Sequence, residues 1–138
     1  MDEIAGESEL SKGTLYLYFK NKEELLMAIN ERGLGILARM LEEALEKGLT
    51  GRKMLRKTGE AYLEFAMKHN DYFRAMMYHE GQIVPEQLDS DVVESCVEKG
   101  NQCISCMIRA IQAGKMDGSI KIAIDSYQLA MLLWATLY

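Results

Sequence analysis

The chain has 138 residues and an acidic composition, with a formal net charge of −5 and 49% hydrophobic residues. These values describe a globular protein of one or two small domains, and they exclude a disordered chain. The longest fully apolar run, residues 129–135, is far shorter than the ~20 residues that span a bilayer, and three cysteines do not form the paired framework of a secreted protein, so we expect a cytoplasmic protein without a membrane segment.

The first predicted elements are two short helices joined by a turn, followed by the start of a long helix. Ser11 is a suitable N-cap for the second short helix, because its hydroxyl accepts from a free backbone N–H in the first turn. Leu15 and Phe19 lie four residues apart and share the buried side. The stretch from Ser11 to Lys22 contains three lysines and no acidic residue, although the whole chain is acidic. An exposed helix of this kind is typical of one that enters the major groove of DNA.

A long helix is predicted over residues 21–47. Asn21 and Glu24 resemble a capping box at its start, and apolar residues recur along it with helical periodicity. Gly33 and Gly35 interrupt the apolar stripe. They are explained either by close packing against another helix or by a flexible point between a DNA-binding tip and the rest of the protein.

Two helices are predicted in the middle of the chain. Thr50 is a suitable N-cap for a helix that reaches about His69, and Asn70 is a suitable N-cap for a short helix over residues 71–80. Apolar residues line one face of each helix, so both are expected to cover one side of a helical core.

Two further helices follow a loop at residues 81–88. The first begins at Ser90 or Asp91, and Gly114 is expected to close it as a C-terminal cap. The second begins near Asp125, which resembles the start of another capping box. No stretch alternates between polar and apolar residues as a strand does, so we predict an all-α chain.

Residues 4–26 resemble the helix-turn-helix signature of the tetracycline-repressor-like (TetR family) transcriptional regulators. The match is the gapless run SKGTLYLYFKNKEEL at residues 11–25, and a weaker match continues through residues 113–120 to the apolar segment that ends at Trp134. Glu9 stands where the family usually has glycine, which puts the local geometry of the turn in question.

The resemblance implies an all-α architecture with two domains. An incomplete helix-turn-helix DNA-binding domain would occupy residues 1–28, and the long helix would join it to a helical-bundle domain for ligand binding and dimerisation at residues 29–138. The resemblance also implies a first helix before Met1 and a further helix after Tyr138. We therefore expect the natural protein to be longer at both ends.

The resemblance places the DNA contacts on the second short helix and at the start of the long helix. The predicted DNA-binding residues are Ser11, Lys12, Gly13, Thr14, Tyr16, Tyr18 and Lys22. Lys12 would donate to guanine, Thr14 would meet a thymine or a phosphate, and Lys22 would bind a phosphate. Without the family pattern, the same lysines would be solvated and the tyrosines would cover a small core.

The predicted partner is a near-palindromic double-stranded DNA operator bound by a homodimer. Residues 129–135 of the last helix are apolar on all sides and need a cover, and a two-fold contact between two copies is the commonest form of such a cover. The resemblance agrees, because it implies a dimer contact through this C-terminal helix. Two copies of the DNA-binding tip would then contact two half-sites.

Aromatic and methionine residues from four predicted helices are candidates for an apolar ligand cavity. These residues are Tyr62, Phe65, Phe73, Met76, Met77, Met107 and Trp134. Side chains that converge between helices enclose such a cavity, although each residue alone is better explained by simple core packing. The resemblance implies a small-molecule effector in this body. The chain is therefore predicted to be a repressor that a small apolar ligand releases from its operator.

Cys96, Cys103 and Cys106 share one face of a predicted helix. Their spacing allows buried neutral thiols, a thiol redox sensor, or a metal site helped by His69 or His79. Buried thiols explain the spacing best, because no second cluster of metal ligands is obvious.

No catalytic arrangement stands out in the sequence. There are two histidines, no phosphate-binding glycine loop and no nucleophile elbow, so we predict no enzyme, no metal and no cofactor. The alternative to a DNA-binding regulator is an all-helical small-molecule-binding or dimerisation module that does not bind DNA.

Overall fold

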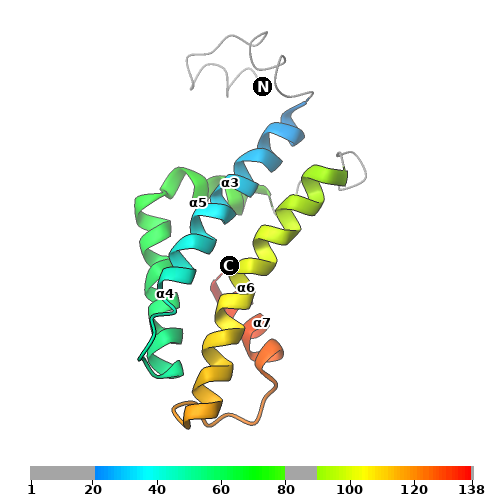
Figure 1. Cartoon of the computed structure of the whole chain (residues 1–138). Helices are drawn as coiled ribbons and strands as arrows, with labels where there is room; N and C mark the ends of the chain where they lie inside the picture. Colours follow the sequence, from blue (N-terminus) through cyan, green and yellow to red (C-terminus); the bar gives the residue numbers. More distant parts are fainter. Residues whose placement is uncertain (1–20, 80–89, 138) are drawn as a thin grey trace.

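The computed structural model describes residues 21–79 and 90–137 (Figure 1). The helices in these ranges are α3 (Lys22–Glu43), α4 (Gly51–Lys68), α5 (Asn70–His79), α6 (Ser90–Asp117) and α7 (Ser126–Leu137). α3 and α6 lie side by side, α4 and α5 pack against α3, and α7 packs against α6. The described residues contain helices and no strand, which confirms the all-α prediction.

Most of the first of the two predicted domains lies outside the described residues. Of the expected DNA-binding domain at residues 1–28, only residues 21–28 are described, and they form the start of α3. The boundary therefore stays a prediction. None of the described helices is both long and apolar enough to cross a bilayer.

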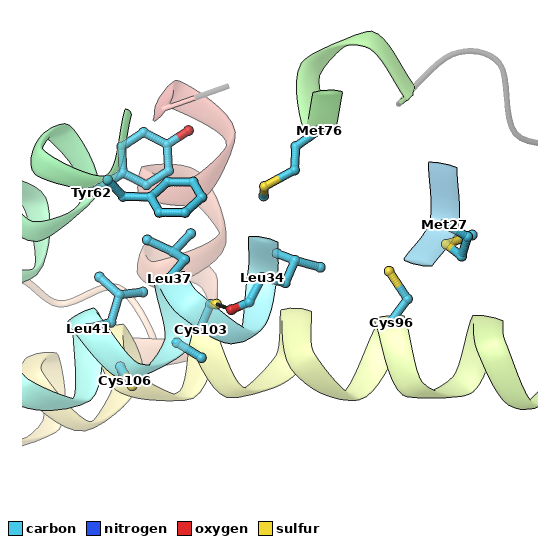
Figure 2. Packing of buried hydrophobic residues seen from close by; sticks show 11 residues of the cluster. Met27, Leu34, Leu37, Leu41, Tyr62, Met76, Cys96, Cys103 and Cys106 are labelled. Carbon is cyan, nitrogen blue, oxygen red and sulfur yellow. Dashed lines mark hydrogen bonds between the residues drawn. The ribbon is translucent and has the colours of Figure 1, made fainter. Parts of the chain in front are cut away.

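The main core lies along the contact between α3 and α6 (Figure 2). Leu34, Leu37 and Leu41 share one face of α3 and are buried. Phe65 of α4 and Cys103 of α6 are fully buried in the same cluster. Because full burial of a large apolar side chain contributes about 1.5–3 kcal/mol, these contacts hold the three helices together.

A second buried cluster joins α6 to α7. Met107 and Ile111 of α6 lie in it together with Ala130 of α7. Trp134 packs against both clusters, so it connects α7 to the core along α3.

Three of the predicted N-caps are present. The side-chain oxygens of Asn21, Thr50 and Asp125 accept from backbone N–H groups in the first turns of α3, α4 and α7. These hydrogen bonds satisfy donors that have no partner within their own helix.

α3 ends at Glu43 and not at the predicted Lys47. The backbone N–H of Ala44 bonds back to the carbonyl of Leu41 at 3.1 Å, and Gly48 follows with a φ of +89°. Glycine adopts this left-handed conformation without steric cost, so the chain can turn here toward α4.

The prediction that Asn70 caps α5 is wrong. Asn70 is the first residue of α5, and its side-chain amide donates to the carbonyl of Ala66 at 3.3 Å. It therefore satisfies a carbonyl at the end of α4. The backbone N–H of His69 also donates to the carbonyl of Phe65 at 2.8 Å, so the chain passes from α4 to α5 with little interruption.

The prediction that Gly114 closes α6 is also wrong. α6 continues to Asp117, and Gly118 follows its end with a φ of +78°. Gly114 is buried inside the helix, where it faces Gly51 of α4. Gly51, which has no side chain, allows the two backbones to approach closely, whereas a Cβ on Gly114 would meet the side chain of Ile120 at 2.4 Å.

Candidate functional site

The residues predicted to bind DNA lie at or before the start of α3. Ser11, Lys12, Gly13, Thr14, Tyr16 and Tyr18 lie outside the described residues. Lys22 is the first residue of α3, where it is partly buried next to the N-cap Asn21. From this point α3 extends into the middle of the body (Figure 1).

A cavity of about 320 Å³ lies between α3, α4, α6 and α7. Its lining residues are Leu41, Arg52, Leu55, Arg56, Thr58, Gly59, Tyr62, Met107, Leu133, Trp134 and Thr136. Large apolar and aromatic side chains form much of the wall, and the volume is near the lower end of the roughly 300–1,000 Å³ of small-molecule sites. The cavity is therefore suited to the apolar part of a small ligand.

Tyr62, Met107 and Trp134 are the predicted ligand residues that line this cavity. The ring of Tyr62 makes an edge contact with the ring of Trp134, with centroids 6.3 Å apart. It makes a second edge contact with Phe73 of α5, with centroids 6.0 Å apart. Such pairs add about 0.5–1.5 kcal/mol beyond the burial of the rings. Tyr62 thus connects the wall of the cavity to α5.

The other four predicted ligand residues, Phe65, Phe73, Met76 and Met77, do not line the cavity. Phe65 is fully buried in the core, and Phe73 and Met77 are partly buried. The sulfur of Met76 lies 2.9 Å from the position that a Cβ on Gly33 would occupy, so α5 sits directly on the backbone of α3. Close helix packing therefore accounts for Gly33.

The polar side of the cavity was missed by sequence reasoning. Arg52 and Arg56 stand one turn apart on α4, and both line the cavity. A signal was present, because the first two turns of α4 carry four cations where a helix favours acidic residues. These cations are Arg52, Lys53, Arg56 and Lys57.

The start of α4 is anchored to the end of α6. The carboxylate of Asp117 accepts from the backbone N–H of Gly51 at 2.8 Å, and the hydroxyl of Ser119 accepts from that of Arg52 at 3.0 Å. Hydrogen bonds from Ser119 and from the backbone of Gly51 hold the pKa of the Asp117 carboxyl below its ordinary value. The wall that α4 contributes to the cavity is therefore positioned by α6.

A larger groove of about 1210 Å³ runs along the surface between α3 and α6. Its acidic residues are Glu31, Glu42, Glu94 and Glu98, and its basic residues are Arg32, Arg39, Lys99 and Arg109. The two signs balance, and few apolar side chains line the groove. We therefore place the candidate ligand site in the smaller, mainly apolar cavity.

Cys96, Cys103 and Cys106 are free thiols buried between α6 and α3. Burial raises the pKa of all three thiols, and that of Cys103 to about 12. Figure 2 shows the hydrogen bond that the Cys103 thiol donates to the backbone carbonyl of Leu34, at 3.6 Å. In the described part of the chain, no three His, Cys, Asp or Glu side chains could hold a metal ion. These features favour neutral core thiols over a sensor or a metal site.

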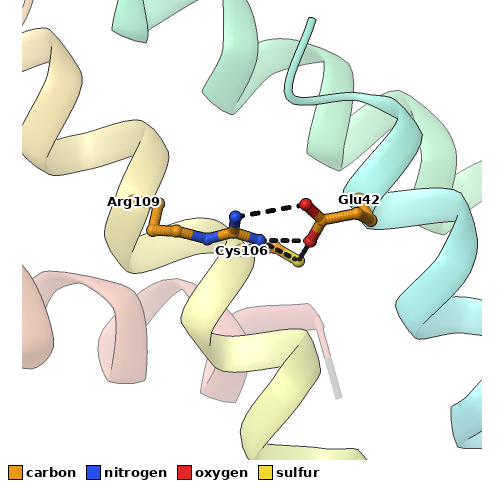
Figure 3. A network of polar contacts seen from close by, with 3 residues as sticks. All are labelled: Glu42, Cys106 and Arg109. Atoms are coloured by element: carbon orange, nitrogen blue, oxygen red, sulfur yellow. Dashed lines mark hydrogen bonds and ion pairs between the residues drawn. The ribbon is translucent and has the colours of Figure 1, made fainter.

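Cys106 also belongs to a polar network that joins α6 to the end of α3 (Figure 3). Its thiol donates to a carboxylate oxygen of Glu42 at 3.4 Å, and Arg109 donates to both oxygens of the same carboxylate. The guanidinium of Arg109 holds the pKa of Glu42 below its ordinary value. The network ties α3 to α6 on the solvent side of the cysteines.

Comparison with protein families gives a match at the start of the chain. Residues 1–29 match the family described as bacterial regulatory proteins, tetR family. The HTH-type transcriptional activator FasR of Mycolicibacterium smegmatis is 29% identical over 101 residues, which are 71% of this chain and 46% of the relative. The fatty acid metabolism regulator protein of Bacillus subtilis is 32% identical over 71 residues, which are 51% of this chain and 37% of the relative. The chain thus spans less than half the length of these two relatives.

Two solved structures share the fold over nearly the whole chain. A bacterial regulatory protein of the tetR family from Rhodococcus RHA1 superposes with a TM-score of 0.80 at 21% identity, covering 99% of this chain and 68% of that one. The TetR family transcriptional regulator PfmR from Thermus thermophilus superposes with a TM-score of 0.79 at 22% identity, covering 96% of this chain and 69% of that one. At these identities the similarity concerns the fold alone.

Proposed function

We propose that the chain, whose residues 1–29 match the tetR family of bacterial regulatory proteins, acts as a dimeric DNA-binding transcriptional regulator. We further propose that it is a repressor. A small ligand with an apolar part would enter the cavity between α3, α4, α6 and α7 and release the protein from its operator. The DNA contacts would be those predicted at Ser11, Lys12, Gly13, Thr14, Tyr16, Tyr18 and Lys22.

One helix supports this proposal, because it connects the two proposed sites. α3 begins at Lys22, inside the segment that matches the family, and Leu41 in its last turns lines the cavity. A change of shape at the cavity therefore acts on the same helix that contains the last residues of the family segment.

A physical route from the cavity to α3 also runs through α5. A ligand against Tyr62 would press on Phe73, which lies on α5, and α5 rests on α3 where Met76 meets Gly33. For this route to regulate DNA binding, the ligand must have different affinities for two positions of α3.

The proposed homodimer contact is the outer face of α7. Tyr127, Met131 and Leu132 on this helix are 58%, 37% and 56% exposed, respectively. Large apolar side chains clustered on one helix are typical of a protein interface, and a two-fold contact is the commonest kind. Such a dimer would present two copies of the DNA-binding segment to two half-sites of a near-palindrome.

The test is a gel shift and a footprint of the full-length protein on the DNA upstream of its own gene, at a stated salt concentration. We expect protection of a near-palindromic site, and we expect the variant Lys12→Ala to lose discrimination at one base position of that site. If the protein binds no duplex specifically, the alternative of a helical ligand-binding or dimerisation module holds. If a ligand that fills the cavity strengthens operator binding, the proposed release by the ligand fails while DNA binding stands.

A further inference from the structure

The cavity beside Trp134 is mainly apolar, and its charged lining residues are two arginines of α4. Leu55, Met107 and Leu133 line it together with Trp134, and Arg52 and Arg56 of α4 also belong to its lining. None of the residues that line it is acidic. A ligand with a cationic group would therefore meet like charge and no counter-charge among the lining residues, which disfavours its binding.

The two arginines are available to a ligand. Within the described residues, Arg52 has no acidic side chain at ion-pair distance; only its backbone N–H is engaged, by Ser119. Arg56 contacts Glu60 through Nε at 3.2 Å, with both side chains largely exposed. Exposed pairs of this kind are weak, and the other guanidinium N–H groups of Arg56 have no acceptor among the residues that the structure describes.

The arginines are also unfavourably placed for the helix itself. Arg52 lies in the first turn of α4, where the helix dipole opposes positive charge, and Arg56 follows it one turn later. The backbone N–H groups of Gly51, Arg52 and Lys53 already have acceptors in Asp117, Ser119 and Thr50. An anion at this place would therefore be held by the two guanidinium groups and not by the end of the helix.

We infer that the effector of this cavity is an anionic amphiphile, with an apolar chain against Met107, Leu133 and Trp134 and a carboxylate or phosphate head bound by Arg52 and Arg56. The inference rests on the proposed effector site and adds the chemical class of its ligand. Two guanidinium groups one turn apart match the several oxygens of such a head. The cavity is small, so a chain of moderate length fits best.

Trp134 provides a direct test, because it is the one tryptophan of the chain and lines the cavity. Its fluorescence is titrated with four probes that share a ten-carbon chain and differ in the head: decanoate, decyl phosphate, decanol and decyltrimethylammonium. We expect decanoate and decyl phosphate to bind about tenfold or more tightly than decanol, and the cation to bind most weakly. The ratio between the two anions then distinguishes a carboxylate from a phosphate head.

The variants Arg52→Gln and Arg56→Gln, singly and combined, test the assignment of the head. We expect the double variant to bind decanoate and decanol with similar affinities and to keep its affinity for decanol, which also shows that it is folded. Lys53→Gln is the matched control, because Lys53 lies between the two arginines in sequence and does not line the cavity. The Lys53→Gln variant should still bind decanoate more tightly than decanol.

The outcomes separate the ligand class from the proposed function. If decanol binds as tightly as the anions, or if the double variant keeps its preference for anions, the anionic class is overturned and an apolar effector cavity remains. If no probe binds, both the ligand class and the effector cavity are overturned. If the anions bind as described but leave the operator complex unchanged in a gel shift, only the regulatory function fails.

Discussion

A Cβ atom placed on Gly51 would lie 1.9 Å from the backbone nitrogen of Gly114, so α4 and α6 touch here through their backbones. The same Cβ would lie 2.5 Å from the carbonyl oxygen of Ala110. No side chain can rotate away to relieve these contacts, because the neighbouring atoms belong to the main chain. The crossing fixes the start of α4, and with it the wall of the cavity that carries Arg52.

We expect Gly51→Ala to lower the free energy of unfolding by about 1–3 kcal/mol, because the two helices must move apart to admit the methyl group. Thermal and urea unfolding followed by circular dichroism provide the measurement. The matched control is Gly100→Ala in α6, where a Cβ meets no atom within 4 Å. That variant should raise stability by about 0.5–1 kcal/mol, since alanine is the better helix former. Equal effects of the two substitutions would contradict the close crossing.

Lys22→Ala is expected to weaken DNA binding at all sequences alike and to lower the slope of log affinity against log salt by about one, because one phosphate contact is lost. Binding to the operator and to unrelated duplexes is measured between low and physiological salt. Lys53→Ala, which removes the same charge from the first turn of α4, should leave the slope unchanged. An unaltered slope in Lys22→Ala would remove this residue from the predicted DNA contacts.

The pair of Glu42 and Arg109 predicts a pH-dependent contribution to stability. Arg109 lowers the pKa of Glu42 below its ordinary value of 4.5 in the folded state. The contribution is therefore complete above the unfolded pKa and is lost as the pH falls through the lower folded pKa. Both side chains are about half exposed, so solvent screening limits the effect to about 0.3–1 kcal/mol.

Glu42→Gln should accordingly lower the melting temperature at pH 7 in low salt, and less so at pH 3 or in 1 M salt. Glu43→Gln is the control, because Glu43 is its exposed neighbour on α3 and makes no ion pair within the described residues. A deficit in Glu42→Gln that is as large at pH 3 as at pH 7 would show that the pair does not act through its charges.

The buried cysteines are expected to be unreactive in the native protein. Burial raises the pKa of Cys96, Cys103 and Cys106, so the reactive thiolate is scarce at pH 7. Iodoacetamide at pH 7 should label none of the three within the time that labels all of them in denaturant, as measured by intact mass. Rapid native labelling of Cys106, which borders the surface groove, would instead support the thiol-sensor interpretation.

Local features of the fold were predictable from sequence. Asn21, Thr50 and Asp125 were predicted as N-caps and act as such, because a cap joins a side chain to a backbone N–H only two or three residues away. Gly114 was assigned to the wrong role, because glycine serves both at the ends of helices and at close crossings. The two roles differ only in what surrounds the glycine, which for Gly114 is the side chain of Ile120 and the backbone of Gly51.

The candidate cavity was predictable in part. Tyr62, Met107 and Trp134 were predicted and line it, whereas Phe65, predicted on the same grounds, is buried in solid core. Periodicity indicates which face of a helix is covered, but it does not indicate which covered residues border an empty space. The charged side formed by Arg52 was missed because cations on a helix are usually solvated.

The sequence by itself determined the all-helical class, the N-caps of α3, α4 and α7, and the resemblance to the tetR family, since these depend on residue types at short spacings along one segment. The tertiary structure alone decided where α4 crosses α6, which aromatic rings meet at Tyr62, and which side of the cavity is charged. These features depend on distances between side chains on different helices. Such distances are set by the packing of the whole core. The contact at Gly51, for example, positions the next residue, Arg52, beside the cavity.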